Sequence, residues 1–513
     1  MLSRMIGAAL TGIEAILVRV EAHGSAGLPA VNTVGLPDSS VRESRERVRS
    51  AILNSGFTWP QRRITINLAP ADLRKAGSSL DLPVAVSIVA LSDGAMAERI
   101  QDDTMLVGEL SLDGGVRPVP GTLSAALEAR ACGIRRILVA PESFAEASLV
   151  QGLEVLGVTT LAQAVAALNG AISISGPFVD AADLASRLAE ARIGVPDMAD
   201  VKAQAVARRA LEVAAAGGHN LLMVGPPGAG KTMLARRLAG ILPPMTLEEA
   251  IDVTRIHSVA ARGGAGGLVA QRPFRAPHHT ASDAALVGGG SGIWGARPGE
   301  VSLAHHGVLF LDEMPEFRRH ALEALRQPLE DGSVIISRAS HAVKFPAAFC
   351  LVAAMNPCAC GYLGSRWKEC TCTPPQIMRY TNRVSGPLLD RIDLHVEVPA
   401  VAYREMSAEE SGESSEAIRA RVVAARERQW ERWPAACNAR MPAALLREHC
   451  ALDRAGHSLM EKAMTTLSLS ARAHDRILKV ARTIADLAAQ ERITRDNLAE
   501  AIQYRGMDRS PLR

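Results

Sequence analysis

Apolar residues recur along this chain either as short continuous runs or at helical spacing. After residue 200, four short runs are each bounded by loop residues: Asn220–Val224, Val308–Leu311, Phe349–Ala354 and Leu394–Val398. Such runs are typical of buried strands, and helical segments between them favour parallel pairing through crossover helices. We therefore predict a parallel sheet in this part of the chain.

The first 170 residues mix the same two patterns. Short apolar runs at Ile64–Leu68, Arg136–Ala140 and Glu154–Val158 alternate with helical patterns such as Ser39–Asn54 and Thr122–Cys132. This alternation indicates an α/β or α+β layout.

The remaining segments differ in composition. Residues 171–200 are expected to be a connector with one short helix, and residues 405–416 are a Ser/Glu-rich, flexible hinge. From Ala417 onward the pattern is helical, with apolar spacing in Ala473–Leu487 and Thr494–Ile502. We therefore divide the chain into a first domain (1–170), a connector (171–200), a core (201–404), and a hinge with a helical lid (405–513).

Composition narrows the classes of function. With 513 residues, 48% hydrophobic and 22% charged, the chain is long and apolar enough for several cores, which excludes a largely disordered protein. Aromatic residues make up only 3%, which argues against a stacking surface for single strands or carbohydrate. The net charge of +3 means that any site for nucleic acid must be local.

We expect no signal peptide, and the longest apolar stretch, Leu82–Leu91, is far shorter than the about 20 residues of a membrane helix. Four of the eight cysteines crowd between Cys358 and Cys372, which is not a disulfide framework. We expect a cytoplasmic protein without a membrane partner.

One glycine-rich motif predicts a nucleotide site. It reads Gly225, Pro226, Pro227, Gly228, Ala229, Gly230, Lys231, Thr232, and it follows an apolar run and opens a helical pattern. Its backbone N–H groups would surround the phosphates of ATP, with Lys231 on the β/γ-phosphates and Thr232 on Mg²⁺. The alternative, a glycine-rich turn before a helix, leaves the register of strand, Lys, Thr and helix unexplained.

Asp312 and Glu313 follow the apolar run Val308–Leu311, about 80 residues after this motif. In P-loop ATPases a carboxylate at this place holds Mg²⁺, and the adjacent Glu polarises the attacking water. By itself such a pair more often ends a strand. Together with the glycine-rich motif, it predicts hydrolysis of a nucleoside triphosphate.

Several motifs together carry a family resemblance: GPPGAGKT, GVLFLDEMPEF, LVAAMNPCACGYLG, LLDRIDLHVEV and SARAHDRILKVARTIADL. Nearly end to end, the chain resembles the magnesium-chelatase-like AAA+ ATPases. The resemblance implies that Asn356 is sensor 1, Arg391 an arginine finger given to the neighbouring subunit, and Arg472 sensor 2 in the lid. Without it, Asn356 would be a turn residue and Arg391 part of a surface ion pair.

An arginine finger acting between subunits makes hydrolysis depend on assembly. Head-to-tail contacts either close as rings or continue as filaments. The family implies a ring of six identical subunits.

Two inserted segments indicate which substrate such an ATPase ring acts on. The segment VGGGSGIWGARPGEVSLAHHG resembles the helix-2 insert of the minichromosome-maintenance and chelatase ATPases. Residues 332–345 alternate like a hairpin that resembles the pre-sensor-1 hairpin of related helicases, with Arg338, Ser340 and His341 near its tip and Lys344 on the return strand. Arg338 and Lys344 are candidate contacts to DNA phosphates. An ordinary solvated hairpin is the alternative.

Two close cysteine pairs, Cys358/Cys360 and Cys370/Cys372, predict a structural Zn²⁺ site with four thiolate ligands. Reduced cysteines that pack a loop, or a redox-sensitive pair, are the alternatives. The histidine pairs His278-His279 and His305-His306 lack the spacing of metal ligands, and we interpret them as structural.

The first domain resembles the fold of Lon protease domains and ribosomal protein S5. Lon-type proteolysis needs a Ser nucleophile with a nearby Lys as its base. Ser78 or Ser79 is a candidate nucleophile, but Leu123 stands at the expected Lys position, and Arg117 stays protonated and cannot act as base. We therefore expect an inactive relative that serves ring assembly or grips DNA.

Taken together, the resemblance implies an ATP-driven helicase or branch-migration motor on single-stranded or branched DNA, acting in recombination of transforming DNA. A magnesium-chelatase-type ATPase is the alternative, although no integrin-like or porphyrin-binding segment is visible. An ATP-dependent protease is a third hypothesis, opposed by Leu123.

Overall fold

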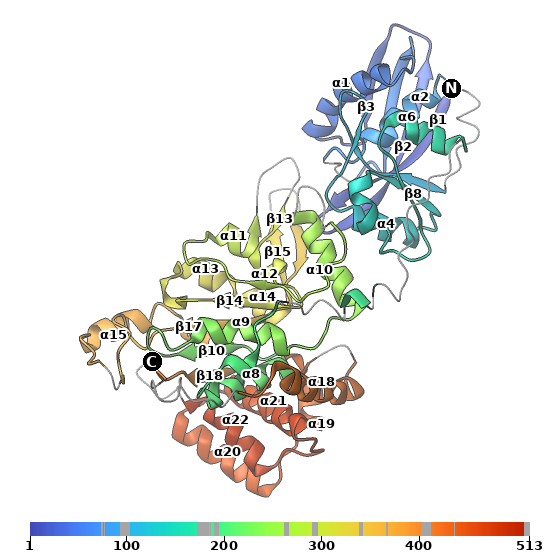
Figure 1. Ribbon diagram of the computed structural model, residues 1–513. Coiled ribbons are helices and arrows are strands. Elements are labelled where there is room, and N and C mark those ends of the chain that lie inside the picture. Colours follow the sequence, from blue (N-terminus) through green and yellow to red (C-terminus); the bar gives the residue numbers. More distant parts are fainter. Residues whose placement is uncertain are drawn as a thin grey trace.

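The computed structural model forms three units in chain order (Figure 1). It describes all residues except 73–74, 76, 93–102, 172–183, 185, 189–193, 261–265, 290–295, 338–341, 366–367, 402–411, 435–436 and 507–513. No helix in the described part is long and apolar enough to cross a membrane.

The first unit is a seven-stranded mixed sheet with helices on both faces. The strand order is β3-β4-β2-β1-β5-β8-β9, with β1 (Leu2–Thr11), β2 (Glu14–Ser25), β3 (Ala30–Val34), β4 (Arg63–Ala69), β5 (Thr104–Leu106), β8 (Arg136–Val139) and β9 (Glu154–Gly157). Two short strands, β6 (Glu109–Leu110) and β7 (Val116–Arg117), form a separate hairpin. One face carries α1 (Ser39–Asn54), α2 (Asp81–Ala90) and α6 (Leu161–Leu168), and the other carries α4 (Thr122–Ala131) and α5 (Phe144–Ala147).

The predicted mixture of strands and helices in this unit is confirmed, but two features were not foreseen. Strand β1 does not alternate between polar and apolar positions, and its five consecutive residues from Met5 to Ala9 are all buried. The apolar stretch Leu82–Leu91 lies in helix α2, which begins and ends one residue earlier, and all ten residues of α2 are buried.

The second unit is built on a five-stranded parallel sheet of order β11-β14-β17-β10-β18. The strands are β10 (Leu221–Val224), β11 (Phe274–Arg275), β14 (Val308–Leu311), β17 (Cys350–Met355) and β18 (Leu394–Glu397). All four predicted strands and their parallel pairing are therefore confirmed. The edge strand β11, with only two residues, was too short to show a pattern.

Helices cover both faces of this sheet. One face packs on α8 (Ala205–Gly217) and α9 (Lys231–Ile241). The other face carries α11 (Asp283–Val287), α12 (Glu300–Leu303), α13 (Arg319–Ala324) and α16 (Gly386–Leu389). The resulting three-layer arrangement places the loops after the strands at one open edge.

The C-terminal unit is helical, as predicted. Its helices are α18 (Ser415–Arg432), α19 (Ala443–His449), α20 (Arg454–Leu467), α21 (Ala471–Leu487) and α22 (Arg495–Gln503). They share one apolar core with α8 and α9. Helix α18 already begins at Ser415, where the side chain of Ser414 accepts the N–H of Ala417, so the end of the predicted hinge is helical. Residues 405–411 of that hinge lie outside the described part.

The first unit meets the second at α10 (Leu247–Ala260). Ile13, in the turn between β1 and β2, packs with Ile256 of α10 and Phe345 of β16 (Ala342–Pro346). Beside this contact, the buried carboxylate of Glu146 accepts hydrogen bonds from the N–H of Leu123 and the hydroxyl of Ser258. An apolar contact and a satisfied polar contact therefore join the two units.

Candidate nucleotide site

The loop Gly225–Thr232 leaves the carboxyl end of β10 and leads into α9. Gly228 and Gly230 have φ of 77° and 86°, a region that favours glycine. A Cβ at Gly225 would lie 2.1 Å from the carbonyl oxygen of Val398, so only glycine fits there. Local backbone geometry thus requires the small residues of the motif.

Lys231 points back into this loop. Its Nζ donates to the carbonyl oxygens of Gly225 (2.6 Å) and Pro226 (2.9 Å) and to Oδ1 of Asn356 (3.1 Å). Burial lowers the pKa of Lys231, while the charges of Asp312 and Glu313 oppose that shift. The carbonyl groups are neutral and compensate only part of the charge of this half-buried ammonium group. A bound phosphate would supply the anionic partner.

The hydroxyl of Thr232 donates to Oδ2 of Asp312 over 2.6 Å. Asp312 follows β14 and Asn356 follows β17, which lies between β14 and β10. Because the carboxyl ends of parallel strands meet at one edge, four predicted residues come together: Lys231, Thr232, Asp312 and Asn356. A hydroxyl and a carboxylate are oxygen ligands suited to Mg²⁺.

Glu313 lies at the rim of the same site. Its backbone is left-handed, with φ 50° and ψ 46°, and its N–H donates to Oδ1 of Asp312 over 3.0 Å. Its side chain is 57% exposed, and Oε2 lies 3.5 Å from Nδ1 of His279. Sequence reasoning missed His279 as a site residue because nothing local places it beside Glu313.

Arg391 lies at the other end of the sheet. It precedes β18, whose first residue, Leu394, pairs with Leu221 at the start of β10. At about 3.3 Å per residue, four strand residues place it at least about 13 Å from the phosphate loop of its own chain. Arg391 is buried, and it donates to Glu330 (2.5 Å) and to the carbonyl oxygen of Pro387 (2.7 Å).

Arg472 is exposed in the first turn of α21. One turn later, Arg476 donates to the carbonyl oxygen of Arg391 (3.0 Å) and also to Asp393. Arg472 and Arg391 therefore lie near the same end of the sheet, away from Lys231. The structure does not bring either arginine to the phosphate loop of its own chain.

The predicted hairpin is present. Strand β15 (Ser333–Ser337) pairs with β16, and the exposed Lys344 lies opposite Ile335. Arg338, Ser340 and His341 lie outside the described residues. In the predicted helix-2 insert, β12 (Gly288–Gly289) pairs with β13 (Arg297–Pro298), and Figure 1 shows β13 and β15 on the side of the core that faces the first unit.

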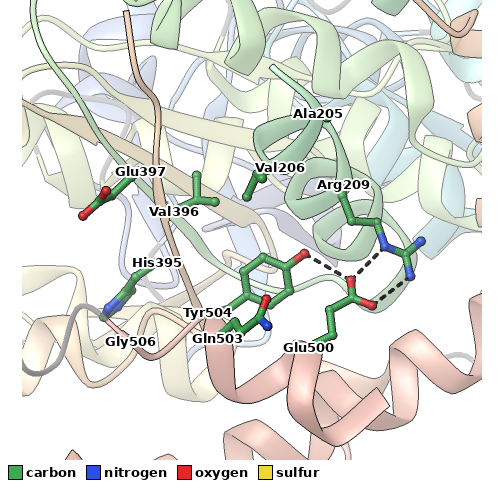
Figure 2. A pocket seen from close by; sticks show the side chains of 10 residues that line it. All are labelled: Ala205, Val206, Arg209, His395, Val396, Glu397, Glu500, Gln503, Tyr504 and Gly506. Atoms are coloured by element: carbon green, nitrogen blue, oxygen red, sulfur yellow. Dashed lines mark hydrogen bonds and ion pairs between the residues drawn. The ribbon is translucent and has the colours of Figure 1, made fainter. Parts of the chain in front are cut away.

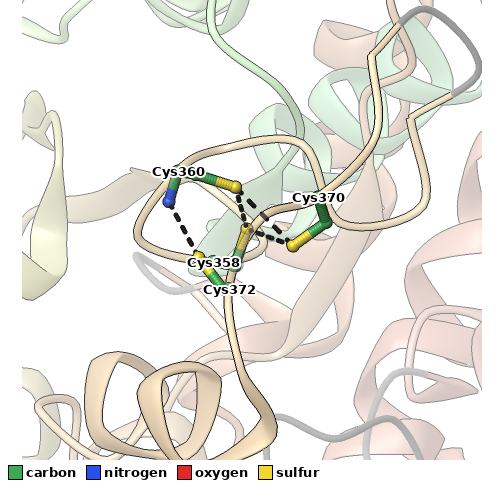
Figure 3. Close-up of side chains that lie close together, drawn as sticks. All are labelled: Cys358, Cys360, Cys370 and Cys372. Carbon is green, nitrogen blue, oxygen red and sulfur yellow. Dashed lines mark hydrogen bonds between the residues drawn. The ribbon is translucent and has the colours of Figure 1, made fainter.

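The four cysteines form one cluster directly after Asn356 (Figure 3). The sulfur atom of Cys358 lies 3.4 Å from that of Cys360 and 3.6 Å from that of Cys370. The N–H of Cys360 donates to the sulfur of Cys372 (3.3 Å). Tetrahedral Zn²⁺ with Zn–S bonds of about 2.3 Å needs sulfur atoms about 3.8 Å apart, so the geometry fits this ion.

The other histidine pair lies at the opposite end of β14. Nδ1 of His305 accepts the N–H of Ala348 (2.9 Å), and Nδ1 of His306 lies 3.5 Å from Glu249. Burial, with the charges of His306 and Arg440, lowers the pKa of His305 to about 2. The His305 ring therefore links the loop before β14 to the loop before β17.

A cavity of about 760 Å³ follows the outer edge of β18 (Figure 2). Three of its polar groups pair with one another: Arg209 of α8 donates to Glu500 of α22 (2.8 Å), and so does the hydroxyl of Tyr504 (3.2 Å). We interpret this cavity as part of the joint between the core and the C-terminal helices.

Three family models match the chain. Residues 197–406 match "Magnesium chelatase, subunit ChlI", residues 20–143 match "Subunit ChlI of Mg-chelatase", and residues 412–505 match the C-terminal part of subunit ChlI. Together they span all three units.

Relatives of similar length are also found. The uncharacterized protein YifB of Salmonella typhimurium is 46% identical over 98% of this chain and 96% of its own. Competence protein ComM of Haemophilus influenzae is 46% identical over 97% of this chain and 96% of its own. The magnesium-chelatase 38 kDa subunit of Acidiphilium rubrum is 28% identical over only 27% of this chain and 45% of its own. The chain therefore belongs to the ComM/YifB family of magnesium-chelatase-like AAA+ ATPases.

Proposed function

We propose that this protein is an ATP-driven DNA motor that works as a ring of identical subunits, six by family resemblance, in recombination of incoming DNA. The observation that carries the ATPase part is the convergence of Lys231, Thr232, Asp312 and Asn356 at one sheet edge. Glu313, at the rim, is the group that would orient the attacking water and take its proton. Mg²⁺ held by Thr232 and Asp312 would neutralise phosphate charge.

The ring rests on where Arg391 lies. This residue and Arg472 are at the end of the sheet opposite the phosphate loop, so they can complete only the site of a neighbouring subunit. Arg391 must also leave Glu330, whose side chain is 47% exposed, to reach a phosphate. Head-to-tail assembly would bring the arginine end of one subunit to the phosphate loop of the next.

The DNA part rests on the relative named competence protein and on the hairpin β15–β16. A cation repeated around a ring grips phosphates without reading sequence. Lys344 is exposed on this hairpin and is the described candidate, with Arg338 as the second.

The decisive experiment measures ATP hydrolysis with and without single-stranded and branched DNA, together with DNA affinity against salt. We expect DNA to stimulate hydrolysis. In the double variant Arg338→Ala/Lys344→Ala, the log–log salt slope should fall by roughly 0.7–0.9 for each lost phosphate contact. An unchanged slope would mean that another surface binds the DNA. A wild-type protein without DNA affinity at low salt would contradict the proposed motor function.

A magnesium-chelatase-type ATPase remains the alternative. The match to a chelatase subunit covers only 27% of this chain, whereas the match to ComM covers 97%. Hydrolysis that ignores DNA would favour the chelatase function.

We further propose that the first unit is a Lon-like domain without protease activity. Leu123 is fully buried, the hydroxyl of Ser79 donates to the carbonyl of Ala8 (2.9 Å), and Ser78 donates to Glu109. Lys75, the one lysine within residues 1–170, is buried and donates to the carbonyl of Pro70 rather than to a serine. Peptide hydrolysis that depends on Ser78 or Ser79 would contradict this proposal.

The four-cysteine cluster is proposed to hold one structural Zn²⁺ per chain. Four thiolates leave no open position, so the ion would brace the loop rather than act in catalysis. This loop touches the nucleotide site, because a Cβ at Gly361 would lie 2.6 Å from Pro227. The cluster thus supports both the phosphate loop and Asn356.

Replacing two of the cysteines tests whether the metal supports the nucleotide site. Cys360→Ser/Cys372→Ser should lose the zinc measured by elemental analysis and should bind ATP more weakly, since the loop beside Pro227 loosens. Cys132→Ser is the matched control, because Cys132 is an exposed free cysteine outside the cluster. Wild-type protein that is metal-free, folded and active would leave the four cysteines as packing residues.

A further inference from the structure

Arg391 lies in a loop whose backbone is fastened to two other segments. The carbonyl oxygen of Arg391 accepts hydrogen bonds from Nδ2 of Asn220 (3.1 Å) and from Nη1 of Arg476 (3.0 Å). Asn220 directly precedes β10 of the parallel sheet, and Arg476 lies on α21 of the C-terminal unit. The backbone of the proposed arginine finger is therefore tied both to the sheet and to the C-terminal helices.

A buried carboxylate completes this fastening. Asp393, two residues after Arg391, is buried and forms an ion pair with Nη1 of Arg476. Its Oδ2 accepts hydrogen bonds from the backbone N–H of Asn220 and from Nδ1 of His219, both over 3.2 Å. Burial would raise the pKa of Asp393, but the charge of Arg476 and the hydrogen bond from His219 hold it below its ordinary value. Arg476 is thus the permanent cation that keeps this carboxylate ionised.

The side chain of Arg391 is held less completely than its backbone. Its Nε is buried without a hydrogen-bond partner among the described residues, which is unfavourable for a donor. Its Nη1 donates to the carbonyl oxygen of Pro387 (2.7 Å), and its Nη2 pairs with Glu330, whose side chain is 47% exposed. The guanidinium group can therefore leave Glu330 while the backbone stays in place, and the backbone then determines where the group arrives.

We propose that Arg476 is a positioning residue for hydrolysis between subunits: it fixes the backbone of Arg391 to α21, so that Arg391 and Arg472 approach the neighbour's ATP as one rigid block. Arg472 lies one turn before Arg476 on the same helix. A catalytic cation must be placed precisely, and an error of about 1 Å can cost about 100-fold in rate. The inference rests on the proposed function, because it requires Arg391 to act on a neighbouring subunit.

Arg476→Gln tests this role, because glutamine keeps much of the side-chain volume but removes the charge. We expect kcat for ATP hydrolysis to fall by about 10- to 100-fold. Affinity for ATP, measured by calorimetry, should stay within about twofold, because Arg476 lies at the end of the sheet opposite its own phosphate loop. Arg476→Lys should restore most of the rate, since a single nitrogen, Nη1, makes both contacts and Nζ of lysine can replace it. The matched control is Arg454→Ala, an exposed arginine in the first turn of α20, which should behave as wild type.

Mixed rings separate a positioning role from simple structural support. Combined with Glu313→Gln, which supplies an intact arginine end, Arg476→Gln should recover about a quarter of wild-type hydrolysis, because its own phosphate loop is intact. Combined with Arg391→Ala, it should show no recovery, because both changes damage the same end of the subunit.

Wild-type kcat in Arg476→Gln, or recovery of hydrolysis with Arg391→Ala, would overturn the inference. Weakened ATP binding, a lowered melting temperature and no recovery with Glu313→Gln would also overturn it, since together they report only structural support. If Arg476→Gln does not fold, the double variant Arg476→Met/Asp393→Asn takes its place in the same assays, because it leaves no buried charge unpaired.

The same assays distinguish failure of this inference from failure of the proposed function. If Arg391→Ala keeps wild-type turnover, the proposed function loses its arginine finger, and the inference fails as well. If Arg391→Ala is inactive and Arg476→Gln keeps the wild-type rate, the inference alone fails.

Discussion

At the scale of single residues, the candidate site separates into groups that hold phosphate and one group that acts on water. Lys231 and Thr232 share one loop, and their contacts to Asn356 and Asp312 link three neighbouring strands. Glu313 is set apart by its left-handed backbone, which turns its side chain to the rim. A non-glycine residue in this conformation is uncommon and is often found at functional sites.

These roles predict different losses. Lys231→Ala should lose ATP binding, because the phosphates lose their buried cation. Glu313→Gln should bind ATP with nearly unchanged affinity yet hydrolyse it at least about 100-fold more slowly, since an amide cannot take the proton. Calorimetric binding and steady-state phosphate release measure the two properties. Normal turnover of Glu313→Gln would remove Glu313 as the base.

At the scale of elements, helix α2 shows how burial decides both structure and charge. All ten of its residues are buried, including Asp81 in its first turn. Nε of Arg47 donates to Asp81 over 2.7 Å, but burial outweighs this pairing and raises the pKa of Asp81 to about 6. Burial of the ionised Asp81 carboxylate therefore destabilises the folded first unit.

This shift predicts a pH dependence. Because the folded pKa exceeds the unfolded value of about 3.9, the folded state holds the extra proton between them, and stability should fall as pH rises from about 4 through 6. The free energy of unfolding should fall by about 2–3 kcal/mol at most, because one pKa unit corresponds to about 1.4 kcal/mol. Hydrogen exchange of peptides from α2 should show it, and Asp81→Asn should remove it. The exposed carboxyl of Glu154 provides the control variant Glu154→Gln. A slope that persists in Asp81→Asn would assign the dependence to another group.

At the scale of the whole molecule, the two ends of the parallel sheet carry different halves of the proposed site. The phosphate loop lies at the carboxyl ends of the strands, and Arg391 precedes the amino end of β18. A single subunit cannot join these halves without breaking the sheet. Hydrolysis should therefore depend on protein concentration.

Mixing two inactive variants tests this arrangement. Arg391→Ala and Glu313→Gln should each hydrolyse ATP poorly alone. In mixed rings, about a quarter of the interfaces would join an intact phosphate loop to an intact arginine, so activity should return to about a quarter of wild type. No recovery, in subunits shown to mix, would place Arg391 outside the neighbour's site.

The sequence alone determined the phosphate loop, the four buried strands and the cysteine cluster. Each of these is written in contiguous or closely spaced residues: Gly225–Thr232 shows the loop, the run Val308–Leu311 shows its strand, and Cys358–Cys372 spans one short segment. The backbone conformation of the loop and the burial of each strand depend on the same few neighbouring residues that form the sequence pattern, so the pattern alone predicts the structure.

Only the tertiary structure decided which distant residues meet. His279 reaches Glu313 because a two-residue strand, β11, pairs beside β14, and two residues carry no periodicity. Likewise, Arg391 pairs with Glu330, and Glu146 bonds Ser258 across the joint between two units. Such contacts depend on strand order and on packing between units, which are set by the summed burial of the whole chain and leave no mark in the local spacing of residues.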